Sequence, residues 1–448
     1  MKRWLLVIMA FVATLPAVFA VATGAHLDVT NPEIGAIIFG LAVLGSAFLL
    51  SWACEVAQLD IPAALALSVL ALVAVLPEYA VDFNLTYQAA TKPEYQELAV
   101  ANMIGANRMI VGLAWPLIIF LFWARFRKRG VTLEKGQRVE IGYLGLAGLY
   151  SLIIPIKGHI DMVDVVVLVG LFILYTVRIT RQAVEEPHLI GPAEVIGQLS
   201  KRARWAVVGF MLVFAAAVIF VSAHPFSESL IHLGKNLGIS EVFMVQWFAP
   251  ISSEAPEIVV CVLFTLRGLA SAGLGALVAS KVNQWTLLVG TLPLVFSLGS
   301  GRLRGLPFSN DPTGLPLNGD QVGAMFVTSG QTLLAVAIMI NLTAHVWEAA
   351  LLFGLFVAQF FFPEHFLFIP IDAHYVFGII YIVLAVILFF RVSIHDHLGI
   401  IKTMFDFKKQ PSVAVVGHGA TVDLETVPEV KAVEAAAKSK GQHIPSGQ

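Results

Sequence analysis

The sequence is poor in charged residues and in cysteine. Lys, Arg, Asp and Glu make up only 13% of its 448 residues, whereas 58% are hydrophobic, and the mean hydropathy is +0.83. A water-soluble domain of this composition would have to expose large apolar patches, so the composition predicts a protein whose solvent is the bilayer. The only two cysteines, Cys54 and Cys261, stand inside apolar segments, which gives no support to a disulfide framework or a cysteine metal site.

Basic stripes and hydrolase motifs are missing as well. The formal net charge of −2 argues against a nucleic-acid partner, which would require a basic surface. The apolar segments contain no His-Glu-x-x-His stretch, no flanking Asp pair and no serine-histidine arrangement, so we expect no enzyme; an intramembrane hydrolase using paired carboxylates is the weakest alternative. His395-Asp396-His397 follows the last apolar segment, where such residues are usually solvated charge, and we assign them no role.

Long apolar runs are what the sequence has in abundance. A helical span needs roughly 20 apolar residues, and these runs lack the alternation of barrel strands. The sequence therefore predicts an all-α integral membrane protein with about 12 transmembrane helices. The predicted spans cover residues 4–23, 33–55, 61–90, 96–123, 139–156, 161–180, 205–223, 240–267, 270–299, 321–342, 346–363 and 373–391.

Lys and Arg residues cluster between alternate spans, and their placement predicts the orientation of the chain. Threading the spans from an inside amino terminus places every cluster in the cytoplasm, as the positive-inside rule requires. We therefore expect both termini in the cytoplasm and a location in the plasma (inner) membrane. The clusters lie at 2–3, 125–138, 178–204 and from 391 onward, and the basic-poor outside loops at 24–32, 91–96, 157–160, 224–239 and 364–372.

Two segments share one unusual pattern, an apolar helix interrupted by Pro-Glu and then a helix rich in small residues. The first is Leu76-Pro77-Glu78 with Gly105-Ala106-Asn107, and the second is Glu254-Ala255-Pro256-Glu257 with Ala279-Ser280-Lys281. With the predicted orientation, the two glutamate helices run in opposite directions. The copies are thus two inverted five-helix repeats, an architecture typical of transporters.

Each part of the pattern suits cation binding. Proline has no amide hydrogen, so Pro77 and Pro256 should free the carbonyls of Val73 and Ser252 and make the helices discontinuous. An unpaired carboxylate near the bilayer centre costs about 2.5–3.5 kcal/mol. Glu78 and Glu257 must therefore be neutralised by a metal ion, a proton or a cationic side chain, and we predict them to be the cation and metal ligands.

Other polar residues near the two motifs are weaker candidates for cation binding. The carboxylates could line a wet vestibule, the serines could bond back to helix carbonyls, and the amides could hydrogen-bond between helices with no substrate. Asn107 is the best of the amides. The candidates are Asp82, Glu254, Ser252, Ser253, Asn102, Asn107, Asn283 and Gln284.

At these residues the chain resembles the cation/calcium antiporter superfamily, the sodium/calcium exchanger membrane region, whose repeats carry proline-glutamate and glycine-serine-asparagine stretches. The likeness covers residues 33–365 as five spans plus five. It implies a secondary active antiporter that moves Ca²⁺ or another small cation against Na⁺ or H⁺, with small inorganic cations and the lipid bilayer as partners and no cofactor. A cation channel is a less favoured alternative, and the oligomeric state stays open.

Departures from the family pattern reduce the oxygen supply of the predicted site. Ala74 and Val75 replace hydroxyl residues, and Lys281 stands where the family has an amide or an acid. Because calcium takes roughly 6–8 oxygen ligands, a sodium/proton exchanger of the same fold is an alternative. If Lys281 faces the cavity, we expect it to pair with Glu78 or Glu257 as a tethered cation.

The remaining parts of the chain are predicted as additions around the two repeats. Residues 1–32 form an extra span, which we expect to be retained although Lys2-Arg3 and the small residues at 17, 20 and 22 also resemble a cleavable signal peptide. The predicted divisions are 1–32, the first repeat at 33–180, a cytoplasmic loop at 181–204, the second repeat at 205–365, an extra span at 366–392 and a disordered cytoplasmic tail at 393–448.

Overall fold

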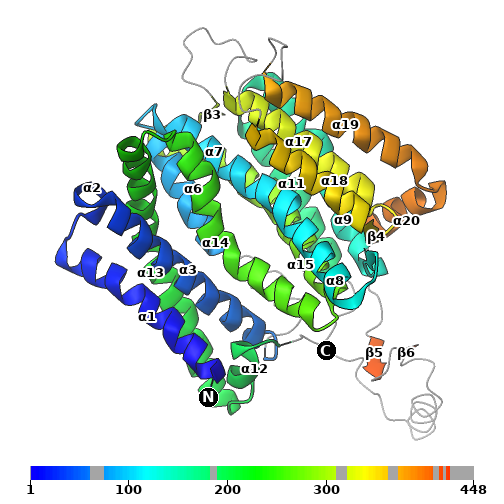
Figure 1. Ribbon diagram of the computed structural model, residues 1–448, viewed down its shortest axis with the longest axis horizontal. Helices are drawn as coiled ribbons and strands as arrows, with labels where there is room; N and C mark the ends of the chain where they lie inside the picture. Colours follow the sequence, from blue (N-terminus) through cyan, green and yellow to red (C-terminus); the bar gives the residue numbers. More distant parts are fainter. Residues whose placement is uncertain are drawn as a thin grey trace, which may run out of the picture.

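The computed structural model is a bundle of long helices with hardly any sheet (Figure 1). It describes residues 2–60, 75–181, 189–308, 320–361, 372–406, 413–416 and 420–423. Within these residues, ten helices are long and apolar enough to cross a membrane, and two shorter helices, α6 and α18, lie among them. The predicted all-α membrane architecture is confirmed.

The helices of the first half are α1 (Lys2–Thr23), α2 (Leu27–Thr30), α3 (Pro32–Ala57), α6 (Leu76–Ala89), α7 (Tyr95–Met109), η2 (Ile110–Ala114), α8 (Trp115–Phe126), η3 (Lys135–Gln137), α9 (Arg138–Ser151), α10 (Ile153–Lys157) and α11 (Met162–Ile179). Those of the second half are α12 (Pro192–Gly197), α13 (Lys201–Leu237), α14 (Glu241–Leu266), α15 (Ala270–Asn283), η4 (Gln284–Leu288), α16 (Val289–Ser300), α17 (Asp320–Met339), α18 (Val346–Phe361), α19 (Ala373–Arg391) and α20 (Ile394–Met404). Among them η2 and η4 are π-helical, and η3 is a 3₁₀ turn.

Short antiparallel strand pairs join the connections between helices. The strands are β1 (Gly130–Thr132), β2 (His159–Ile160), β3 (Leu306–Pro307), β4 (Thr343–His345), β5 (Val413–Val416) and β6 (Ala420–Asp423). β1 pairs with β4, β2 with β3, and β5 with β6. The first two pairs each tie a connection in the first half of the chain to one in the second half.

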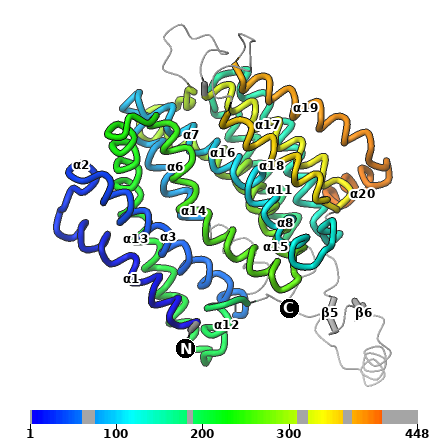
Figure 2. The backbone as a smooth tube through the Cα atoms, viewed as in Figure 1, coloured from blue at the N-terminus to red at the C-terminus, as the bar shows by residue number. Residues whose placement is uncertain are grey.

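Helices α6 and α14 lie between two groups of helices (Figures 1 and 2). On one side, α1, α3, α12 and α13 share a separate apolar core. On the other side, α9, α11, α16, α17, α19 and α20 pack together. Glycines allow the close approach of α14 to its neighbours: a Cβ on Gly105 of α7 would lie 1.8 Å from the carbonyl oxygen of Gln246, and one on Gly273 of α15 would lie 2.8 Å from that of Cys261.

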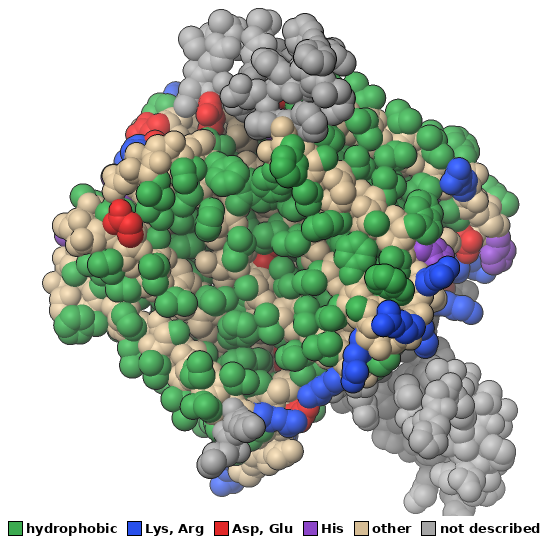
Figure 3. Space-filling view, in the orientation of Figure 1, with side chains coloured by type: hydrophobic (Ala, Val, Ile, Leu, Met, Phe, Trp, Pro, Cys, Tyr) green, Lys and Arg blue, Asp and Glu red, His purple; other side chains and the backbone are tan. Residues whose placement is uncertain are grey.

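The outer surface is apolar over most of the visible face, and Lys and Arg gather along one end of it (Figure 3). Large hydrophobic side chains point outward from the helices; Phe220 of α13 and Leu298 of α16 are 80% and 76% exposed. In water these side chains would be unfavourable, so this surface is the one that contacts lipid.

Several predicted boundaries are wrong. Residues 224–237 do not form an outside loop, because α13 continues through Pro225 to Leu237. Residues 181–204 are not all loop, since α12 and the start of α13 lie there. The tail predicted from residue 393 begins with α20, whose Met404 packs on Gly142 of α9.

The predicted break at Pro256 is also wrong, because α14 runs unbroken through Pro250 and Pro256. Pro77 lies in the first turn of α6, where its missing amide hydrogen costs nothing. Val73, whose carbonyl was predicted to be free, and Ala74 lie outside the described residues.

Candidate functional site

The two predicted glutamates line one small cavity where α3, α6 and α14 meet. Its volume is about 80 Å³, enough for a cation with few waters, and it lies between Glu78 in the first turn of α6 and Glu257 in the middle of α14. Glu78 is buried, whereas Glu257 is partly exposed. The other lining residues are Ala47 and Ser51 of α3, Val75 and Pro77, and Ser253, Glu254 and Pro256 of α14.

Helices α6 and α14 run antiparallel. Gln88 near the end of α6 donates a 3.1 Å hydrogen bond to Glu228 in the last third of α13, and α14 begins shortly after α13 ends. The end of α6 and the start of α14 are therefore at the same end of the molecule. It follows that Asp82, one turn after Glu78, and Glu254, one turn before Glu257, lie on the same side of the glutamate pair.

Neighbouring helices hold these carboxylates with neutral donors. Asn102 of α7 donates to Asp82 at 2.8 Å. Ser280 of α15 donates to Glu257 at 2.9 Å, and Gln284 at the start of η4 donates to Glu254 at 2.9 Å. Ser280 and Gln284 are one helical turn apart, so one face of this helix presents both donors to α14.

Several buried oxygens in this region have no hydrogen-bond partner among the described residues. They belong to three carboxylates and two amides, the groups that hard cations prefer. Buried oxygens are normally satisfied, so this donor set fits a cation or, on the carboxylates, protons. The atoms are Glu78 Oε1, Asp82 Oδ2, Glu254 Oε2, Asn102 Oδ1 and Gln284 Oε1.

Within the described part of the chain, no three His, Cys, Asp or Glu side chains lie close enough together to hold a metal ion. Glu78, Glu254 and Glu257 nevertheless interact electrostatically with one another. The predicted metal ligands are thus neighbours without forming a finished carboxylate cage. A bound cation would need amide or water oxygens in addition to the carboxylates.

Lys281 is completely buried between α15 and α7. Its Nζ donates to the backbone oxygen of Asn107 and, at 2.7 Å, to its Oδ1, and it lies 5.2 Å from the centre of the Trp285 ring. The expected direct pairing with Glu78 or Glu257 is absent from the ion pairs of the described residues, although the ammonium interacts electrostatically with Glu254 and Glu78. The oxygen of Asn107 is therefore engaged by Lys281.

The remaining predicted residues contribute less. Ser253 lines the cavity, yet its hydroxyl donates back to the carbonyls of Ala249 and Pro250 at 3.4 and 3.3 Å. Ser252 lies beside Gly40 of α3 and outside the cavity lining. Asn283 is buried at the end of α15 but does not line the cavity.

Sequence reasoning missed the contribution of α3. Ser51 lines the cavity, and Glu55, one turn further along α3, accepts a 3.5 Å hydrogen bond from it and keeps one buried oxygen without a partner in the described structure. Their spacing of four residues in an otherwise apolar helix was the available signal.

Two ion-pair clusters lie at the end of the molecule that carries the amino terminus. Arg204 of α13 binds Asp60 through two hydrogen bonds of 2.6 and 2.7 Å, which hold the pKa of Asp60 below its ordinary value. Glu194 of α12 accepts hydrogen bonds from Arg267, at 2.9 Å, and from Arg3, and the bond from Arg267 is the main cause that lowers the pKa of Glu194. Because Arg267 directly follows α14, the second cluster connects α1 and α12 to the helix that carries the acidic site.

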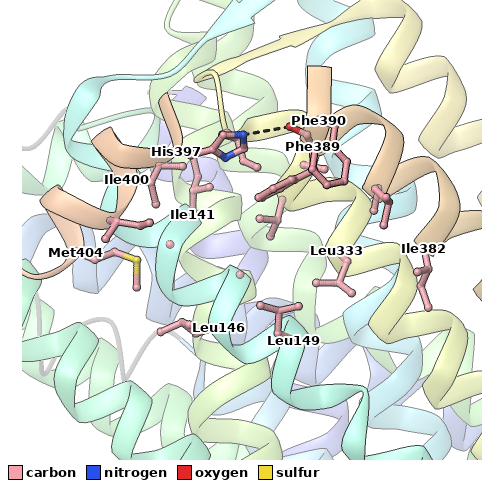
Figure 4. A pocket seen from close by; sticks show the side chains of 18 residues that line it. Ile141, Leu146, Leu149, Leu333, Ile382, Phe389, Phe390, His397, Ile400 and Met404 are labelled. Atoms are coloured by element: carbon pink, nitrogen blue, oxygen red, sulfur yellow. Dashed lines mark hydrogen bonds between the residues drawn. The ribbon is translucent and has the colours of Figure 1, made fainter. Parts of the chain in front are cut away.

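A larger cavity of about 490 Å³ between α9, α17, α19 and α20 is not a cation site (Figure 4). Its walls are apolar side chains such as Leu149, Leu333 and Ile382, and its polar side chain, His397, is bonded to the carbonyl of Phe389 at 3.1 Å. Its described lining residues offer no oxygen ligands from side chains, unlike the cavity between α3, α6 and α14.

Buried carboxylates between antiparallel helices in a bundle of membrane spans are typical of transporters of small cations. The chain belongs to the sodium/calcium exchanger protein family, whose model matches residues 33–181 and 207–363. The resemblance to the cation/calcium antiporter superfamily is thus confirmed, and this family consists of transporters.

Several solved structures are similar to this chain. The H⁺/Ca²⁺ exchanger CAX is 34% identical, covers 91% of this chain and 98% of its own, and superposes with a TM-score of 0.82. YfkE shares the fold at 14% identity, covering 78% of this chain and 98% of its own with a TM-score of 0.55. The sodium-calcium exchanger NCX_Mj is 17% identical, over 73% of this chain and 97% of its own, with a TM-score of 0.48. A search of curated proteins found no match.

Proposed function

We propose that this chain exchanges Ca²⁺, or another small cation, for protons at the cavity between α3, α6 and α14. The observation that carries the proposal is the set of buried carboxylate oxygens without partners on Glu78 and Glu254, which line that cavity, and on Asp82, one turn further along α6. A carboxylate in this setting must be neutralised, and a proton or a metal ion can do so in turn. Likeness to an H⁺/Ca²⁺ exchanger over 91% of the chain supports protons as the counter-ion.

The cation is bound by Glu78 and Glu257, with Glu254 and Asp82 forming an approach from one side. With the amino terminus inside, that side is the outer one, and Ser51 and Glu55 lead toward the cytoplasm. Movement of the helix group α1, α3 and α13 against the larger group would expose the cavity alternately to the two sides.

Purified protein in sealed proteoliposomes containing a trapped pH dye tests this proposal. An inward Ca²⁺ gradient should drive saturable proton efflux, and Glu78→Gln or Glu257→Gln should reduce it to the level of empty vesicles. Glu140→Gln is the matched control, because Glu140 is another buried glutamate but lies on α9, outside the cavity. Absence of Ca²⁺-driven proton movement would refute Ca²⁺/H⁺ exchange.

Lys281 favours a second candidate, Na⁺/H⁺ exchange, because it adds a fixed positive charge near Glu254 and Glu78. We assign it the role of a tethered cation that takes the place of one transported ion. A fixed charge disfavours a divalent ion more than a monovalent one. Proton efflux driven by a Na⁺ gradient but not by Ca²⁺, and lost in the same two glutamate variants, would establish this candidate instead.

A further inference from the structure

A second polar cavity lies at the end of the molecule where α7 and α14 begin. Its volume is about 410 Å³, and its walls come from α7, α14, α17, α18, α19 and Ser240, which precedes α14. This size is in the range of sites for small organic molecules, of roughly 300–1,000 Å³, and is far larger than one inorganic ion needs. The proposed cation exchange gives this cavity no role.

Arg108 of α7 lines this cavity and is only 2% exposed. It donates to the side-chain oxygen of Gln359, and its guanidinium lies 5.3 Å from the centre of the Trp247 ring. Gln359 in turn donates to the hydroxyl of Tyr381 at 2.9 Å, which fixes its amide with the oxygen toward Arg108. The Nε of Arg108 has no hydrogen-bond partner among the described residues.

No carboxylate forms an ion pair with Arg108 in the part of the chain that the structure describes. A guanidinium buried within a membrane is strongly unfavourable unless it is paired, so this charge calls for an anionic partner. Arg108 also directly follows Asn107 but contacts α14 and α18, whereas Asn107 contacts Lys281 on α15. The cavity therefore lies on a different face of α7 from the contact with Lys281, and Glu97 and His374 also line it.

The other residues that line the cavity indicate which class of anion fits it. Trp247, Phe243 and Phe360 provide flat apolar surfaces, and Gln321 presents a buried Oε1 that has no donor in the described structure. A guanidinium fork matches a carboxylate through two parallel hydrogen bonds. We propose that this cavity binds a small organic carboxylate that also carries a hydroxyl or amino donor, with the carboxylate on Arg108 and the donor on Gln321.

Binding can be measured on the purified full-length protein in detergent, with lactate and alanine as probes and with methanesulfonate, which has neither a carboxylate nor a hydroxyl or amino donor, keeping the ionic strength constant. Lactate or alanine should raise the unfolding temperature saturably and change the emission of Trp247, and Trp247→Phe should remove the emission change. Arg108→Gln should weaken binding at least tenfold. These readouts need no ion flux, so they are independent of the proposed exchange.

Gln359→Glu keeps the proposal testable if Arg108→Gln does not fold. This change supplies an internal carboxylate to Arg108, so it should raise the unfolding temperature without ligand and abolish the effect of lactate. Glu140→Gln should bind as the parent protein does. Equal binding of lactate by Gln359→Glu and the parent protein, or no saturable effect of either lactate or alanine, would overturn the proposed carboxylate site at Arg108. Equal saturation by chloride would overturn the organic carboxylate as its ligand.

Discussion

The ammonium group of Lys281 is bonded to both oxygens of Asn107, and the two residues stand at equivalent places in the two halves of the chain. Each precedes a π-helical segment by three residues, Asn107 before Ile110–Ala114 and Lys281 before Gln284–Leu288. Such π-helical segments often occur at functional sites. The second half of the chain thus has the charged Lys281 at the position where the first half has the amide of Asn107. The ammonium of Lys281 donates a hydrogen bond to the oxygen of that amide.

Lys281→Asn should change the number of ions moved in each transport cycle. Removal of the fixed charge frees the Asn107 oxygen and leaves the neighbouring carboxylates one positive charge short, so the site should take up one additional monovalent cation or proton. The measurement is the dependence of flux on membrane potential in proteoliposomes, compared with that of the parent protein. Unchanged selectivity and stoichiometry would remove Lys281 from the mechanism.

Glu254→Gln should slow transport without abolishing it. Glu254 is one turn from Glu257 and accepts a 2.9 Å bond from Gln284, so we expect it to shape the approach to the site while Glu78 and Glu257 hold the ion. The expected result is a several-fold rise in the KM for the cation. Complete loss of flux, as expected for Glu257→Gln, would instead make Glu254 a principal ligand.

Gly105→Ala should destabilise the contact between α7 and α14. The added Cβ would lie 1.8 Å from the carbonyl oxygen of Gln246, and such overpacking typically costs about 1–3 kcal/mol. Gly170→Ala on α11 is the matched control, because a Cβ there meets nothing within 4 Å. Thermal unfolding in detergent should separate the two variants; equal unfolding temperatures would show that α7 can shift freely.

The acidic pair could be predicted from sequence because Pro77-Glu78 and Pro256-Glu257 both fall within long apolar segments, a pattern independent of exact helix boundaries. The partners of these acids could not be predicted so well. Ser51 comes from a helix without any repeat motif, and the bond of Lys281 to Asn107 depends on how α7 and α15 are rotated. Packing also decided the helix ends: Pro225 and Pro256 lie inside continuous helices, since neighbours in a bundle can compensate for a missing hydrogen bond.

Asp60→Asn should lower the unfolding temperature at neutral pH, because it removes the carboxylate that Arg204 binds. The pKa of Asp60 is held below its ordinary value of about 3.9. Its stabilising effect is therefore fully present above that pH and is lost as the pH falls through the lowered pKa. Unfolding curves of the parent and the variant should converge in strong acid, and a difference that persists there would assign the effect to packing. Arg204→Lys should lower the unfolding temperature by less than Asp60→Asn does, since lysine keeps the positive charge but lacks the two N–H donors with which the guanidinium binds Asp60.

Glu194→Gln should make the acidic cavity easier to reach from the end that carries the amino terminus. Glu194 joins Arg3 of α1 to Arg267 after α14, so loss of its charge should loosen the tie between the two helix groups at that end. A Ser51→Cys reporter in the cavity lining, labelled with a water-soluble thiol reagent, measures the access, because the native cysteines at 54 and 261 are buried. Glu241→Gln, which breaks a 3.5 Å ion pair with Lys235 at the opposite end, should leave the labelling rate unchanged. If both variants label at the rate of the parent protein, the Glu194 cluster does not control access to the site.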